Sequence, residues 1–191
     1  MATFACCATA FIDLACAEGD TLDHLDVTWV EPDLAVGAAF HLTHLADLQA
    51  SAIRRVVDLR AEACDDSSVL GAHAIELLHL PTSDQAPIAP LALDMGVAWV
   101  CSALDRCYKV LVHCQHGVGR SAMLAACVMV ARGLDLPGAL RRLKQSRCCV
   151  SPSSRQLGAI IEWTERRARA RAERVALSLD ELAAIVHEPA S

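Results

Sequence analysis

Short blocks of hydrophobic and polar positions follow one another along the chain and predict alternating strands and helices. Short apolar runs rich in β-branched residues indicate strands, at 27–30, 34–36, 53–59, 75–80 and 109–113. Apolar residues spaced three or four positions apart, or a capping box at 178–181, indicate helices, at 42–50, 91–107, 121–131, 137–145, 153–174 and just after residue 181. Buried strands joined by crossover helices predict an α/β fold, a three-layer sandwich whose central, mainly parallel sheet of about five strands is flanked by helices.

One main domain accounts for most of the chain. Its 191 residues are 54% hydrophobic, which is enough to bury a sizeable core. Residues 1–26 follow no clear pattern and are expected to form an N-terminal extension, before a domain at 27–174 and a C-terminal helical tail at 175–191. The longest run without Asp, Glu, Lys or Arg has 13 residues, too few to span a bilayer. The N-terminus also lacks the basic start of a signal peptide, so we expect a cytoplasmic protein.

Charge is distributed unevenly between the two halves of the sequence. Residues 1–100 carry 15 acidic and 3 basic side chains, whereas residues 101–191 carry 8 acidic and 14 basic ones. An anion-binding site is therefore expected in the second half. The overall charge of −6 argues against nucleic acid or an anionic membrane as a partner. The ten cysteines lack C-x-x-C spacing, so no zinc or other metal site is expected.

The candidate chemistry lies in residues 110–121, which read Val-Leu-Val-His-Cys-Gln-His-Gly-Val-Gly-Arg-Ser. An apolar strand leads into Cys114, and a helix begins near Arg120. The glycines between them allow a tight turn whose backbone N–H groups form a concave anion site, to which the helix N-terminus adds positive potential. A guanidinium grips two phosphate oxygens in a planar fork. In such a field the pKa of a thiol falls, which predicts a thiolate nucleophile at Cys114.

This segment resembles the signature of the cysteine-dependent protein tyrosine phosphatase superfamily, and most closely that of the small atypical dual-specificity phosphatases. The family pattern is His-Cys, five residues, Arg, then Ser or Thr, and it is complete here from His113 to Ser121. Residues 53–60 and 79–84 also resemble the second core strand and the strand that leads to the general-acid loop. The resemblance covers roughly residues 27–165 and implies that the main domain is a dual-specificity phosphatase-like catalytic domain that needs no metal or cofactor.

The resemblance assigns roles to individual residues. Cys114 is the nucleophile that forms a phospho-cysteine intermediate, Arg120 and the loop amides stabilise the phosphoryl oxygens, and Ser121 assists release of the sulfur. Asp84, 30 residues before Cys114, is the general acid and then the base. Phosphate binding is expected from the whole loop, namely Gln115, His116, Gly117, Val118, Gly119 and Arg120.

Other residues allow more than one interpretation. His116 stands where relatives carry small residues or Lys, and its imidazole either adds a pH-dependent charge or points outward and shapes the rim. His113 is expected to orient the Cys loop through hydrogen bonds. Gln156 is a candidate for the amide that positions water in relatives. Oxidation of Cys64 with Cys114 to a disulfide is a minority alternative, because Asp65 and its neighbour Asp66 disfavour a thiolate at Cys64. Asp58 and Asp94 are weaker candidates for the acid, since Asp58 falls inside a predicted strand.

The predicted function is a metal-independent phosphatase acting on phosphotyrosine, phosphoserine or phosphothreonine in a phosphorylated protein partner. The absence of Lys from the loop argues against a highly charged inositol lipid. Alternatives are a phosphatase of a sugar, lipid or RNA phosphate, a rhodanese-like sulfurtransferase, and a non-catalytic phosphate-binding module.

Overall fold

The computed structural model describes residues 24–170 and 177–187, so most of the expected N-terminal extension and parts of the C-terminal tail lie outside the described residues. Five strands form one sheet in the order β1-β2-β5-β3-β4, with bounds β1 (Val27–Glu31), β2 (Leu34–Gly37), β3 (Ile53–Arg60), β4 (Glu76–Thr82) and β5 (Lys109–His113). Only β1 and β2 pair antiparallel, and the other three pairings are parallel. The predicted mainly parallel, five-stranded sheet is thus confirmed.

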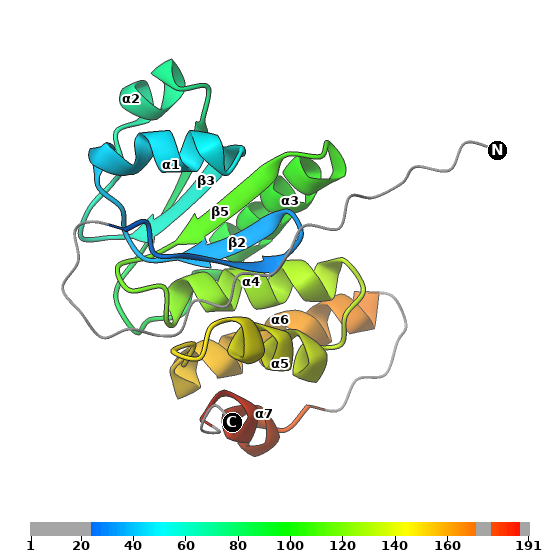
Figure 1. The fold of residues 1–191 in the computed structure, drawn as a ribbon. Helices are drawn as coiled ribbons and strands as arrows, with labels where there is room; N and C mark the ends of the chain where they lie inside the picture. The colour runs from blue at the N-terminus through cyan, green and yellow to red at the C-terminus, as the bar shows by residue number, and fades with distance from the viewer. Residues whose placement is uncertain (1–23, 171–176, 188–191) are drawn as a thin grey trace.

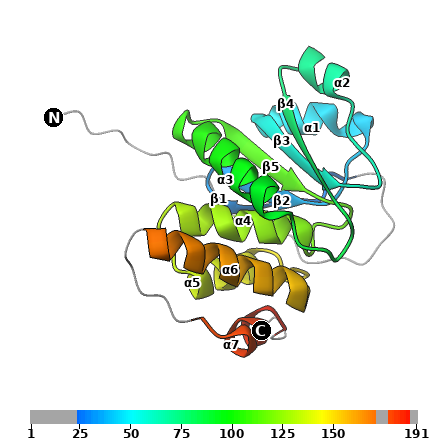
Figure 2. The same ribbon diagram turned by 180° about the vertical axis from the view of Figure 1, so that it is seen from behind.

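Helices cover both faces of the sheet and complete the three predicted layers (Figure 1). Their bounds are α1 (Leu45–Ala50), α2 (Ser67–Ala72), α3 (Pro90–Asp105), α4 (Arg120–Ala131), α5 (Leu136–Ser146), α6 (Ser154–Ala170) and α7 (Leu179–His187), with a 3₁₀ turn at Leu42–His44. The smaller apolar cluster packs α1 and α2 against one face, and the larger one packs the remaining helices against the other. α4 lies between the sheet and the pair α5 and α6, with α7 outermost (Figures 1 and 2). No helix in the described ranges is long and apolar enough to cross a membrane.

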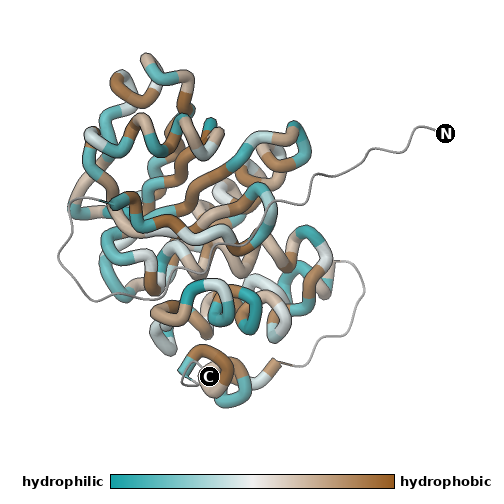
Figure 3. The backbone as a smooth tube through the Cα atoms, viewed as in Figure 1, coloured by the Kyte–Doolittle hydropathy of each residue, from teal (hydrophilic) through white to brown (hydrophobic). Residues whose placement is uncertain are grey.

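The central position of β5 and α4 follows from their composition. All but the first residue of β5 are buried, and α4 is buried from Arg120 to Met129. A strand flanked on both faces is apolar along its whole length, and a helix that is apolar all round is covered on all sides. Figure 3 shows β5 largely in the hydrophobic colour. The segment that joins these two elements is therefore anchored at both ends in the core.

Two local features differ from the sequence expectations. β4 continues to Thr82 and includes Pro81, so it extends two residues beyond the strand expected at 75–80, and the loop that follows begins at Ser83. A proline fits there because β4 is an edge strand, where a missing N–H breaks no ladder bond. The short helix α2 was not expected; Asp66 caps it by accepting hydrogen bonds from the N–H groups of Ser68 and Val69.

Candidate active site

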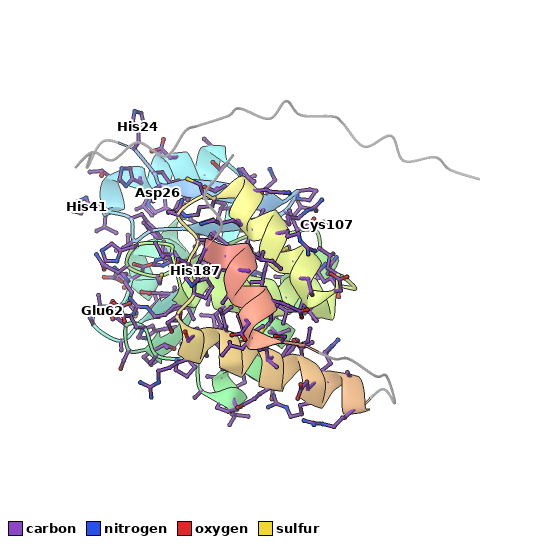
Figure 4. The ribbon with its side chains drawn as sticks, turned by 90° about the horizontal axis from the view of Figure 1, so that it is seen from below. His24, Asp26, His41, Glu62, Cys107 and His187 are labelled. Carbon is purple, nitrogen blue, oxygen red and sulfur yellow. The ribbon has the colours of Figure 1, made fainter. Side chains whose placement is uncertain are left out.

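The loop between β5 and α4 lies at the carboxyl edge of the parallel strands, where loops from several strands meet. In Figure 4, Glu62 and His41, which follow β3 and β2, lie on one side of the molecule, and Cys107, which precedes β5, lies on the other. Gly117 in the loop has a φ of +67°. A Cβ at this position would come within 2.7 Å of both the Gly37 carbonyl and Arg147. The tight course of the loop therefore requires glycine here.

Cys114 lies at the base of this loop and is 3% exposed. Burial opposes ionisation of its thiol, but hydrogen bonds from the Ser121 hydroxyl and from the backbone N–H groups of Ser121, His116 and Gly117 outweigh it and lower the pKa. The Ser121 Oγ lies 3.5 Å from the sulfur and is fully buried. The predicted nucleophile and its hydroxyl neighbour are thus in contact, and the thiolate is stabilised.

Arg120 opens α4 and is only 1% exposed. Its Nη1 and Nη2 donate to the two carboxylate oxygens of Glu62 at 2.9 and 2.8 Å, and Nη1 also donates to the Thr82 carbonyl at 2.8 Å. Nη2 lies 3.2 Å from Asp84 Oδ1. The buried Nε has no hydrogen-bond partner among the described residues. The guanidinium is held by its outer nitrogens, and Nε is left as a donor for a bound anion.

The hydrogen bonds from Arg120 lower the pKa of Glu62 to about 2. Sequence reasoning missed Glu62. One signal for it exists: it lies two residues beyond the end of β3, and loops that follow parallel strands meet at one edge of the sheet.

Asp84 lies on the loop that joins β4 to α3, and its carboxyl is 64% exposed. It faces an open cavity of about 510 Å³ lined by Ala61, Glu62, Ser83, Asp84, Gln115, His116 and Arg120. The competing acids lie elsewhere. Asp58 is fully buried against Arg60, and Asp94 accepts hydrogen bonds from Trp163 and Arg166. Among the acids considered from sequence, Asp84 is the one that lines the cavity.

The remaining loop residues are held by backbone contacts. The Ala39 N–H donates to the Gln115 carbonyl at 3.2 Å, and the Ser151 N–H donates to the Val118 carbonyl at 3.0 Å. The side chain of His116 is exposed and lines the cavity, as in the interpretation that it shapes the rim.

Arg147, at the end of α5, is a support that sequence reasoning missed. Its guanidinium donates to the carbonyls of Gly117 at 3.0 Å and His116 at 3.1 Å. It also forms a two-pronged ion pair with Asp26, with N–O distances of 2.5 and 2.6 Å. No local pattern marks this arginine, because its partners come from distant parts of the chain. Arg147 fastens two loop carbonyls to the body of the protein.

His113 is fully buried, but its contacts differ from the expectation. We expected its hydrogen bonds to orient the Cys loop. Instead its Nε2 lies 2.9 Å from Asp65 Oδ2, and Nδ1 has no partner within the described part of the chain. Asp65 in turn pairs with Arg60, which also binds Asp58. His113 therefore ties β5 to the segment after β3, the same segment that carries Glu62.

Gln156 is buried and does not line the cavity. Its amide is bonded to backbone at both ends, accepting from the Ser153 N–H at 2.8 Å and donating to the Ala86 carbonyl at 3.0 Å. The role of positioning water, which the resemblance implies, stays a prediction.

Two clusters of potential metal ligands occur among the described residues, Asp58 with Cys64 and His79, and Asp58 with Asp65 and His113. Both share Asp58, whose oxygens already accept hydrogen bonds from Arg60 and from the Asp65 N–H. This carboxylate is therefore occupied by protein donors.

Cys64 and Cys114 are free thiols, and burial together with the charges of Asp58 and Asp65 raises the pKa of Cys64.

Comparison with known proteins places this geometry in context. The family model described as the dual specificity phosphatase catalytic domain matches residues 34–166. Dual specificity protein phosphatase 4 of Homo sapiens is 26% identical over 159 residues, which are 82% of this chain and 40% of that protein. The chain thus spans less than half the length of this curated relative.

Solved structures show the same fold at low identity. The crystal structure of PTPMT1 in complex with PI(5)P is 21% identical, with a TM-score of 0.71 over 76% of this chain and 98% of that one. Tk-PTP in the active form is 24% identical, with a TM-score of 0.68 over 74% of this chain and 97% of that one. These likenesses concern the fold.

Proposed function

Because the chain belongs to the dual specificity phosphatase family, we propose that it hydrolyses phosphate monoesters on proteins, at phosphotyrosine, phosphoserine or phosphothreonine. One observation carries the proposal. The buried guanidinium of Arg120 and the exposed carboxyl of Asp84 line one open cavity, and the thiol of Cys114, whose pKa is lowered, lies at the base of the loop that carries the lining residues Gln115, His116 and Arg120. In-line phosphoryl transfer needs a nucleophile, a stabiliser of the equatorial oxygens and a proton donor, and these three residues supply them.

In the first step the Cys114 thiolate attacks phosphorus. A phosphorus–sulfur bond forms as the ester phosphorus–oxygen bond breaks, and Asp84 gives its proton to the departing oxygen. The equatorial oxygens accept hydrogen bonds from the loop amides and from Arg120, whose Nε has no protein partner in the described structure. The phosphate replaces Asp84 as a partner of Nη2, while Glu62 keeps the guanidinium in place.

In the second step water attacks the phospho-cysteine. Asp84, now ionised, accepts a proton from that water, and inorganic phosphate forms as the phosphorus–sulfur bond breaks. The departing sulfur carries negative charge, which the Ser121 hydroxyl at 3.5 Å stabilises. The step restores the thiolate and the protonated Asp84.

The charges around the cavity favour a substrate with a single phosphate. Arg120 is the one permanently charged cation that lines it, beside the carboxyl groups of Glu62 and Asp84 and the imidazole of His116. A second phosphate on the same substrate finds no second permanent cation among these lining residues and is repelled by Glu62. The side chains of Asp84 and Glu62, which line the cavity, are 64% and 43% exposed, so the cavity is shallow on this side. A shallow cavity supports access for the short side chains of phosphoserine and phosphothreonine as well as for phosphotyrosine.

A phosphate-release assay tests the proposal. The substrates are phosphotyrosine, phosphoserine and phosphothreonine peptides, vesicles containing PI(5)P, and a sugar phosphate, with Cys114→Ser as the inactive control. We expect release from the peptides to exceed that from the other substrates. Faster release from vesicles or sugar phosphate contradicts a protein substrate. Sulfur transfer from thiosulfate to cyanide without phosphate release, or phosphopeptide binding without turnover, contradicts a phosphatase.

A further inference from the structure

The loop that carries Asp84, residues 83–89 (the acid loop), is fastened to the start of α6 by side chains. Ser153 Oγ donates to the Gln85 carbonyl at 2.9 Å, and Gln156 Nε2 donates to the Ala86 carbonyl at 3.0 Å. These bonds grip the two residues that directly follow Asp84. We call Ser153 and Gln156 the brace.

The brace is itself fixed. Gln156 Oε1 accepts the Ser153 N–H at 2.8 Å, and Ser153 Oγ accepts the Gln156 N–H at 3.3 Å. Gln156 is 1% exposed and lies against the loop between β5 and α4, residues 114–120 (the phosphate loop), because a Cβ on Gly119 would come within 2.7 Å of its Oε1. A buried amide with both ends bonded has one orientation. It therefore connects the acid loop and the phosphate loop through fixed contacts.

The backbone of the acid loop needs such support. Gln85 has a φ of +57°, in the left-handed region that residues other than glycine seldom adopt. Residues in this conformation persist only where the surroundings hold them. Ser153 binds the carbonyl of this same residue, immediately after Asp84. The bond therefore sets the direction in which the chain leaves Asp84.

We propose that Ser153 and Gln156 are positioning residues that hold the acid loop over the cavity, so that Asp84 stands beside Arg120 before a substrate arrives. This inference rests on the proposed function, because it assigns Asp84 the role of acid. Gln156 then acts on the reaction through Asp84, whose loop it binds at Ala86, and not through a water molecule.

Two substrates that differ in the leaving group separate this role from a general structural one. Phenyl phosphate releases a basic oxygen that needs a proton, whereas difluoromethylumbelliferyl phosphate releases an oxygen that is stable as an anion. In Gln156→Met, which keeps the bulk under Gly119, we expect kcat/KM for phenyl phosphate to fall about tenfold and kcat/KM for the fluorinated ester to change by less than about two-fold, because kcat/KM reports the step in which the leaving group departs. In an Asp84→Asn background the same change causes no further loss.

Matched variants and a second measurement complete the test. Ser153→Ala gives the same selective loss, Ser153→Thr restores activity by keeping the hydroxyl, and the exposed Gln145→Met leaves both rates unchanged. Hydrogen exchange of the backbone amides at residues 84–88, where Pro87 carries no N–H, accelerates in Gln156→Met.

Equal loss on both substrates, additional loss in the Asp84→Asn background, or unchanged exchange at residues 84–88 overturns the brace. Wild-type protein that releases phosphate from neither ester overturns the proposed function, and the exchange measurement still decides the brace.

Discussion

Both carboxylate oxygens of Glu62 accept hydrogen bonds from the guanidinium of Arg120, at 2.9 and 2.8 Å. The pair joins the segment after β3 to the first residue of α4. Glu62 fixes the plane of the guanidinium, and this plane determines where Nε meets a phosphate oxygen. Glu62 therefore positions Arg120 in the site, although Glu62 lies outside the sequence signature at 113–121.

Glu62→Gln should lower kcat/KM by about tenfold, because a two-pronged charged contact becomes a single neutral one and Arg120 gains freedom. Steady-state kinetics on a phosphotyrosine peptide measure this. Glu76→Gln is the matched control, since it breaks an ion pair with Arg55. Glu76 is the first residue of β4, whereas the site lies at the carboxyl ends of the strands. Equal effects of the two substitutions would show that Glu62 does not position Arg120.

The same pair predicts a change of stability with pH. The pKa of Glu62 is lowered from 4.5 to about 2 in the folded protein. Its ionised form therefore stabilises the fold fully above pH 4.5, and this contribution is lost as the pH falls toward 2. Urea unfolding at about pH 6 and about pH 3 should show the stability gap between wild type and Glu62→Gln shrinking at the lower pH. A gap of constant size contradicts the assignment.

Asp84→Asn should lower the turnover of phosphopeptides by about 10²–10⁴, the usual contribution of a general acid. The wild-type pH profile is expected to be bell-shaped and to peak below neutrality, because Cys114 must be ionised while Asp84 is protonated. The alkaline limb should disappear in the variant, since asparagine has no proton to lose. Asp94→Asn removes a carboxylate that binds Trp163 instead of lining the cavity and should retain the limb. An alkaline limb that survives in Asp84→Asn assigns the acid to another residue.

Ser121→Ala should move the acidic limb of that profile to higher pH. The Ser121 hydroxyl is one of the hydrogen bonds that outweigh burial and lower the pKa of Cys114, so its loss raises that pKa. Thiol titration by the rate of iodoacetamide alkylation checks the shift directly, with Ser146→Ala on the exposed face of α5 as the control. A limb that stays in place would mean that the backbone amides alone stabilise the thiolate.

Arg147→Met should destabilise the folded protein by about 2 kcal/mol, because the buried Gly117 carbonyl and the part-buried His116 carbonyl lose their charged donor. Turnover should fall as well, since the loop is no longer fastened. Urea denaturation measures the first effect. Arg142→Met, which removes an exposed pair with Glu31, should cost less than about 0.5 kcal/mol. Arg147→Met with wild-type stability contradicts the role of this side chain as a support.

The sequence predicted the central part of the molecule well because its signals are local. The apolar run of β5, the glycines of the loop and the apolar helix α4 each leave a pattern within a few residues. Glu62 and Arg147 leave none, since each is one charged residue among many and its role depends on a partner far along the chain. Gln156 was noticed by its position, but its contacts depend on where the acid loop lies.

The ion pair between Arg147 and Asp26 has a practical consequence for expressing the domain. A fragment that starts at residue 27 retains the five strands of the described sheet and every residue of the Cys-to-Arg signature. It nevertheless removes the carboxylate against which Arg147 is oriented. Truncation at this end would remove a partner of Arg147, and Arg147 in turn holds the loop that carries Cys114. The N-terminal boundary chosen for a recombinant domain is therefore expected to affect its activity.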